Sequence, residues 1–101
     1  MNLADEQEEC FESETGAPTL TVIASDHQRM LAYSSFCDAL MEGNRITLRF
    51  RDWHVVISGE SLGVVWKQFQ MQDVRVIRVS NAGTVYGCKI SGIEIREIKE
   101  D

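Results

Sequence analysis

The chain has 101 residues, which is enough for one domain and no more. Hydrophobic residues make up 44% and charged residues 26% of the total, the balance of an ordinary globular protein. No apolar run approaches the roughly 18–20 residues that span a bilayer, so we expect no membrane contact. The acidic start has neither a basic nor an apolar region, and we therefore expect no signal peptide.

The net charge of −6 is unevenly distributed. Residues 1–44 carry nine acidic side chains against Arg29 alone, whereas residues 45–101 carry nine basic and seven acidic ones. Residues 1–17 contain six acids, no base and few apolar residues, so burial cannot offset the entropy of ordering them. We expect a disordered acidic arm at 1–17 and a single small domain at 18–101 that begins at Pro18.

Three cysteines, Cys10, Cys37 and Cys88, form an odd set without close spacing. A disulfide framework favours an even number, so the pattern predicts reduced thiols and a cytoplasmic protein. Free cysteine is usually a small buried hydrophobe, and we expect this of Cys37 and Cys88.

The first strand is predicted at 19–24, where threonine and β-branched residues concentrate. The next segment, 29–42, fits two structures. A stripe of apolar residues and a capping box formed by Ser25 and Gln28 favour a helix. A strand over 30–42, bent at Ser34-Ser35 after a turn at 26–29, also explains Arg45 and Arg49 through cross-strand pairing, and we prefer it.

The segment 36–58 has the pattern of a three-stranded meander. Folding it about Gly43-Asn44 and again about Arg51-Asp52 sets opposite charges on one face and apolar residues on the other. A slip of one residue would turn every side chain to the wrong face, so the register is strongly specified. The predicted pairs are Glu42–Arg45, Met41–Ile46, Ala39–Leu48, Asp38–Arg49, Cys37–Phe50, Phe50–Trp53, Leu48–Val55 and Ile46–Ile57.

A helix near 60–71 follows. Its apolar stripe repeats at helical spacing, and Ser58 or Ser61 is the expected N-cap. Further strands are predicted at 74–79 and 86–97, separated by a turn at 81–83, with a bulge at Gly92. The fold class is α+β: a curved antiparallel sheet of five or six strands with one covering helix near 60–71. The alternative is a ferredoxin-like βαββαβ fold with an extra helix at 26–42. The stripe residues of the 60–71 helix are Leu62, Val65, Trp66 and Phe69.

Chemistry-bearing motifs are sparse. His27 and His54 are the histidines available as general bases. A triad of Cys37 or Ser35 with His54 is disfavoured, because the register points Cys37 inward and His54 outward. Zinc, calcium and phosphate-loop spacings are absent from the sequence. We expect a protein that is not an enzyme, with no catalytic, cofactor-binding or metal-binding residues.

The remaining functional hypothesis is binding. A protein partner or self-association is expected, because small sheets either protect their edges or use them for strand addition. The strand 74–79 is apolar on both faces, so it must be central or covered by another subunit. Nucleic-acid binding is disfavoured, because Asp38 and Glu42 oppose two arginines and no aromatic residue is exposed for stacking. The candidate binding surface consists of Arg45, Arg49, His54, Arg75 and Arg78.

Residues 20–26, followed by Met30-Leu31-Ala32 and Ala39-Leu40, resemble the opening strand and helix of ACT regulatory domains. His27-Gln28-Arg29 stand where that family has a Pro-Gly pair. The resemblance covers about a fifth of the chain. It implies a βαββαβ module that binds amino acids at a domain interface, and hence small-molecule sensing as the alternative function.

Overall fold

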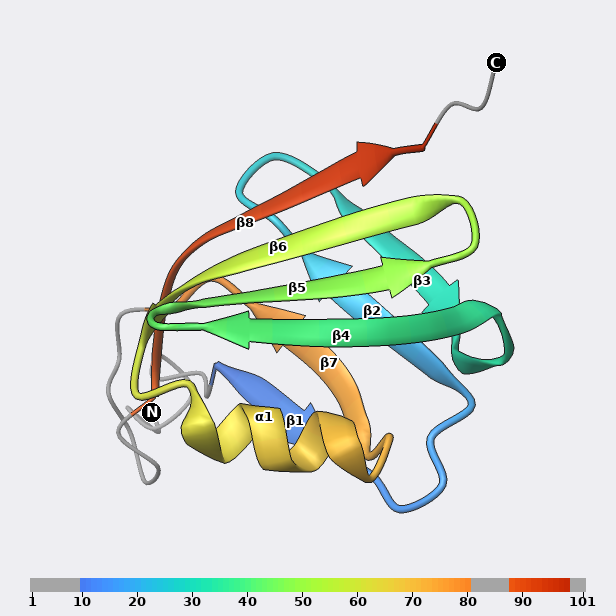
Figure 1. Cartoon of the computed structure of the whole chain (residues 1–101), viewed down its shortest axis with the longest axis horizontal. Helices are drawn as coiled ribbons and strands as arrows, with labels where there is room; N and C mark the ends of the chain where they lie inside the picture. The colour runs from blue at the N-terminus through green and yellow to red at the C-terminus, as the bar shows by residue number, and fades with distance from the viewer. Residues whose placement is uncertain (1–9, 81–87, 99–101) are drawn as a thin grey trace, which may run out of the picture.

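The structure is a computed structural model that describes residues 10–80 and 88–98. Within these residues the chain forms eight β-strands, one α-helix and one short 3-10 helix (Figure 1). The predicted turn at 81–83 and the start of the predicted arm, 1–9, lie outside the described residues. The elements are β1 (Phe11–Ser13), β2 (Thr19–Ile23), β3 (Gln28–Ala32), η2 (Tyr33–Ser35), β4 (Phe36–Glu42), β5 (Arg45–Phe50), β6 (Trp53–Glu60), α1 (Gly63–Gln70), β7 (Val74–Arg78) and β8 (Lys89–Glu97).

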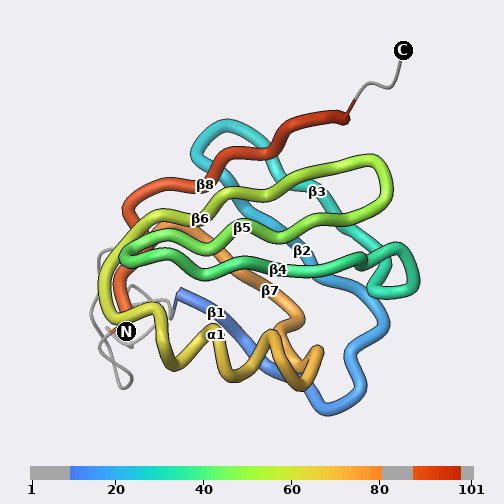
Figure 2. Tube along the Cα trace, in the orientation of Figure 1, coloured from blue at the N-terminus to red at the C-terminus, as the bar shows by residue number. Residues whose placement is uncertain are grey.

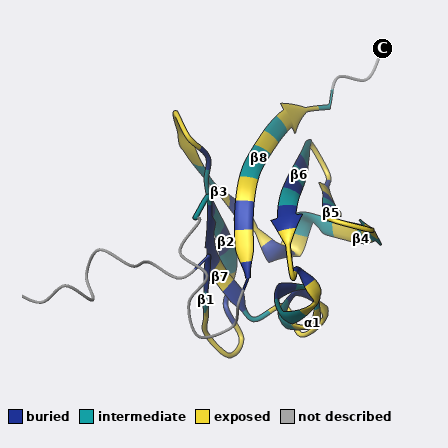
Figure 3. Cartoon of the chain, turned by 90° about the vertical axis from the view of Figure 1, so that its left-hand side faces the viewer, coloured by how far each residue is buried: buried dark blue, intermediate teal, exposed yellow. Residues whose placement is uncertain are grey.

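The strands form two curved four-stranded sheets. One has the order β1-β7-β2-β3 and the other the order β4-β5-β6-β8, and every pair is antiparallel except β2 with β7. Viewed from the side, the two sheets face one another, with buried residues between them (Figure 3). The predicted α+β class with a curved antiparallel sheet is confirmed. The division into two sheets was not predicted, because strand alternation says nothing about which strands share a sheet.

The segment 29–42 is extended, as preferred. β3 ends at Ala32, the chain turns in η2 at the predicted bend, and β4 continues in the other sheet. The alternative helix at 26–42, and with it the βαββαβ order, is wrong. Side chains of β3 alternate between exposed and buried, and each residue of β3 has a partner on β2, so sheet pairing prevails over the helical stripe.

The register of the meander is confirmed from Glu42–Arg45 to Asp38–Arg49, and across β5 and β6 for Leu48–Val55 and Ile46–Ile57. One predicted pair is wrong: Phe50 lies opposite Phe36, not Cys37. A bulge at Cys37 shifts the register by one residue and turns its side chain to solvent, so Cys37 is exposed and not buried as expected. Phe36 takes the inward place because its ring contacts Phe50 at a centroid distance of 5.3 Å.

β1 (Phe11–Ser13) lies within the predicted acidic arm, so the folded domain begins before the predicted start at Pro18. β1 is an edge strand beside β7, with Phe11 opposite Ile77. Phe11 is buried and Glu12 forms ion pairs with Arg75 and Arg78. Local composition favoured disorder, but this contact with a distant strand supplies burial and charge pairing that composition does not reveal.

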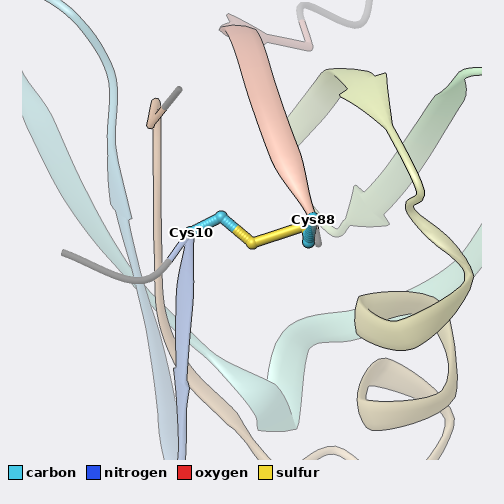
Figure 4. The surroundings of a disulfide bond; sticks show 2 residues. All are labelled: Cys10 and Cys88. Atoms are coloured by element: carbon cyan, nitrogen blue, oxygen red, sulfur yellow. A yellow bond between two sulfur atoms is a disulfide. The ribbon is translucent and has the colours of Figure 1, made fainter. Parts of the chain in front are cut away.

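Cys10 and Cys88 form a disulfide, which corrects the prediction of three reduced thiols (Figure 4). Their Cα atoms are 6.4 Å apart, and both residues are buried. Cys10 directly precedes β1 and Cys88 directly precedes β8, so the bond joins the two sheets. The odd count misled the prediction because Cys37 remains free while the other two pair.

The predicted helix is confirmed as α1, which links β6 of one sheet to β7 of the other (Figures 1 and 2). Its inward residues, Val65 and Phe69, are buried in the common core. The predicted serine cap is wrong: Leu62 occupies the N-cap without a side-chain hydrogen bond, and Ser61 takes a positive φ of 56°. Leu62 is buried, so packing outweighs capping here.

β7 lies between β1 and β2, and most of its side chains are buried. Its apolar character on both faces is therefore explained by a central position within this chain. The expected bulge in the last strand is confirmed beside Gly92. Ser58 pairs with Gly92 and Gly59 with Ile90, so Ser91 is the extra residue.

Tyr33 connects the two sheets at the η2 corner. Its hydroxyl donates a buried hydrogen bond of 2.5 Å to the carbonyl of Val74 in β7. Burial, with a smaller effect of the Asp73 charge, raises the pKa of Tyr33 above its ordinary value. The group is therefore held neutral in the folded state.

Replacing Tyr33 with phenylalanine is expected to cost about 0.5–1.5 kcal/mol of folding free energy at neutral pH, the usual value of one such hydrogen bond. In the unfolded chain Tyr33 ionises near pH 10, whereas in the folded chain its pKa is higher. The stability of the wild type therefore falls as the pH rises above about 10. Urea unfolding at pH 7, 9 and 10.5 measures this. An equal alkaline loss in the Tyr33→Phe variant would contradict the argument.

Candidate protein-interaction site

A groove opens between β4 and α1. It has a volume of about 210 Å³, below the roughly 300–1,000 Å³ of sites that hold drug-sized ligands, so it fits single side chains. The aromatic residues Trp66 and Phe69 of this groove come from α1, and Phe36 comes from β4. We call this the apolar groove. Its lining residues are Phe36, Ala39, Trp66, Phe69, Gln70 and Gln72.

The sequence positions these residues by its two periodicities. Phe36 and Ala39 lie on the inward face of β4, on either side of the bulge. Trp66 is one turn of helix from Phe69 and Leu62 and lies at the margin of their stripe, which leaves it half-buried. The rim residues Gln70 and Gln72 are exposed and uncharged. The groove is therefore apolar inside and neutral at its mouth.

Phe36, on the floor of the apolar groove, belongs to an aromatic cluster. Phe36 packs edge-on against Tyr33, with 6.3 Å between ring centroids, and against Phe50. Tyr33 is in turn held by its hydrogen bond to β7. Such contacts restrain the side chain of Phe36 before a partner binds, and a restrained site pays a smaller ordering cost on binding.

β4 is an edge strand along this groove. Among the described residues it pairs with β5 alone. The two-residue loop Gly43-Asn44, with Gly43 at a φ of 57°, makes Glu42 and Arg45 a hydrogen-bonded pair. Because such pairs alternate along a ladder, the backbone groups of Ala39 and Met41 point away from β5 toward solvent. Unpaired N–H and C=O groups thus border the apolar groove.

The structure does not bring the five predicted binding residues together. Arg45, Arg49 and His54 lie on the outward face of the β4-β5-β6-β8 sheet. Both oxygens of Asp38 accept hydrogen bonds from Arg49. These bonds lower the pKa of Asp38, so the carboxylate neutralises Arg49. On this surface the positive charge of Arg49 is therefore balanced, whereas Arg45 forms no ion pair with the described residues.

Arg75 and Arg78 lie on β7 of the other sheet. Arg75 reaches Glu12 at 2.5 Å and Glu14 at 3.5 Å, and Arg78 also contacts Glu12. The hydrogen bond from Arg78 lowers the pKa of Glu12. Residues of the predicted acidic arm therefore pair with these two arginines, an arrangement that the charge asymmetry alone only suggested.

A second groove lies at the Gly43 end of the same sheet. It is larger, about 570 Å³, and we call it the polar groove. Its lining contains two bases, Arg45 and Lys89, and two acids, Glu42 and Glu60. Its lining residues are Glu42, Asn44, Arg45, Ser58, Gly59, Glu60, Lys89 and Ser91.

The candidate catalytic groups are arranged without a nucleophile beside a base. Cys37 is exposed at the bulge, where its thiol contacts the Ser35 carbonyl at 3.7 Å. His54 is the register partner of Arg49 and Arg96 on the outward face. His27 contacts Asp26 at 2.6 Å in an exposed turn. In residues 10–80 and 88–98, no group of three or more His, Cys, Asp or Glu side chains is placed to hold a metal ion.

Comparison of the chain with protein-family models, with curated proteins and with solved structures gives no match. In the described part of the chain, no helix combines the length and apolar character needed to cross a membrane. The two grooves and the edge of β4 are therefore the features of the described structure that bear on function.

Proposed function

We propose that this chain is a non-enzymatic protein-interaction domain that binds an extended segment of a partner protein along β4. The partner segment adds one strand to the sheet and places an apolar side chain in the apolar groove. The observation that carries the proposal is the coincidence of an edge strand and an apolar groove on its inward side. Strand addition uses main-chain hydrogen bonds for affinity and side-chain pockets for specificity.

We propose an extended segment as the occupant of this site, because an extended chain presents N–H and C=O groups at the spacing of those left unpaired on β4. A helix laid on the same groove would leave the backbone of Ala39 and Met41 unpaired. The small volume and the neutral glutamine rim favour one large apolar side chain over a drug-sized ligand. Self-association through the same edge is the principal competing outcome.

Screening a random octapeptide display library is expected to enrich sequences with apolar residues at alternate positions. Trp66 reports binding directly in a Trp53→Phe variant, because the chain has two tryptophans. Phenylalanine keeps a ring beneath the Arg29 guanidinium, which lies 3.6 Å from the Trp53 centroid. The enriched peptide should shift the emission of Trp66.

Ala39→Gln fills the apolar groove with a longer side chain and is expected to weaken peptide binding about tenfold or more, a loss of about 1.4 kcal/mol. Thr47→Gln introduces the same side chain on the outward face of β5 and should leave binding unchanged. Urea unfolding checks that both variants are folded. Two results would overturn strand addition by a partner. One is equal enrichment of peptides on the Ala39→Gln protein. The other is a protein that is a dimer in the absence of peptide and becomes a monomer when the peptide binds.

A second candidate function is small-molecule binding, which the polar groove favours by its size and its hydrogen-bonding groups. Balanced charges suit a ligand that carries both signs, and such a ligand would raise the melting temperature by mass action. The ACT-like architecture does not support this candidate, since its helix is not formed. Nucleic-acid binding finds little support, because Arg49, Arg75 and Arg78 are each paired with a carboxylate.

The expected cytoplasmic location stays a prediction. The disulfide between Cys10 and Cys88 bears on it, because disulfides persist in oxidising compartments and are rare in the cytosol. An oxidising compartment is therefore the second candidate location.

A further inference from the structure

The outward face of β4 carries a charge pattern next to the proposed binding edge. Asp38, Leu40 and Glu42 are all exposed there. Asp38 is engaged by Arg49 through both carboxylate oxygens. Glu42 lies across from Arg45, yet among the described residues it forms no ion pair or side-chain hydrogen bond. Glu42 is thus the carboxylate on this edge that remains open to a partner.

The spacing between Glu42 and the apolar groove defines what a partner must offer. Ala39 points inward and Glu42 outward, three residues further along the strand. Because side chains alternate across a strand, residues that lie opposite these two in an added strand also point to opposite faces, three residues apart. In an antiparallel partner the residue opposite Glu42 comes first.

We propose that Glu42 recognises a lysine or arginine in the partner segment, three residues from the apolar residue that enters the apolar groove. This inference rests on the proposed strand addition and names its partner class: an extended basic-and-apolar segment. Opposite charges directly across a strand pair attract, and like charges repel. The exposed position of Glu42 limits the contribution to that of a surface ion pair, so it selects among partners and the groove provides most of the affinity.

The test uses two fluorescein-labelled octapeptides, TKVTLTVT and TEVTLTVT, measured by fluorescence anisotropy at low salt. In an antiparallel arrangement the second residue faces Glu42 and the leucine faces Ala39. We expect the lysine peptide to bind wild type about threefold to tenfold more tightly than the glutamate peptide. Glu42→Lys should reverse this preference, and 0.5 M salt should reduce it.

Glu97→Lys provides the matched control, since it makes the same charge change at an exposed position of β8, three strands away from β4 and outside both grooves. It should preserve the wild-type preference. Equal peptide preference in wild type and Glu42→Lys, with binding still weakened by Ala39→Gln, would overturn the role of Glu42 and leave strand addition intact. Binding of neither peptide, or binding unaffected by Ala39→Gln, would overturn strand addition itself.

Discussion

Replacing Cys10 and Cys88 together with alanine is expected to lower the free energy of unfolding by about 2–4 kcal/mol. The bond closes a loop over a sequence separation of 78 residues. Chain-entropy arguments place so long a loop toward the upper end of the range. The bond also holds β1, which has three residues and pairs with β7 alone among the described strands. For a domain of this size the melting temperature should fall by roughly 10–20 °C.

Urea unfolding with and without the double substitution measures this loss. Cys37→Ala is the matched control, because its thiol is exposed and unpaired, and it should change stability by less than about 0.5 kcal/mol. Maleimide labelling of the denatured wild type should count one thiol before reduction and three after it. Equal stability of wild type and the double variant would contradict a structural role for the bond. The same count on protein trapped in cells separates an oxidising compartment, with one thiol, from the cytoplasm, with three.

Gly59→Ala is expected to destabilise the domain by about 2–4 kcal/mol, because it forces atoms into occupied space. A Cβ at this position would lie 1.9 Å from the carbonyl oxygen of Lys89 and 2.9 Å from the Cα of Ile90. Both neighbours are backbone atoms of β8, held by pairing with β6 beside the bulge. Relieving this clash therefore requires β6 and β8 to separate where β6 leaves the sheet.

Gly63→Ala offers a matched comparison within the same connection. A Cβ at Gly63 meets nothing within 4 Å, and Gly63 is the first residue of α1. Alanine has the higher helix propensity, so this substitution should raise stability by about 0.5–1 kcal/mol. Thermal unfolding of the two variants should move in opposite directions. A neutral Gly59→Ala would show that β8 can yield at the bulge.

Some features of the candidate site follow from local sequence patterns, and others depend on contacts between distant segments. The inward position of Ala39 and the apolar stripe with Trp66 and Phe69 follow from periodicity. That β4 is an edge strand, and that α1 lies beside it, depends on how the chain between them is folded. The residues of the predicted arginine surface are divided for the same reason, since Arg49 and Arg75 lie on different sheets.

The sequence alone determined the register of the meander over residues 38–58 and the presence of α1. Both depend on contacts between residues close in the chain, where alternation, helical spacing and the Gly43-Asn44 turn act directly. Only the tertiary structure decided that Cys10 meets Cys88, that the acidic segment supplies β1, and which strands share a sheet. The first two contacts join residues more than sixty positions apart, and β2 pairs with β7 across 55 positions (Thr21 with Val76), so their energy comes from burial and pairing that no local pattern encodes.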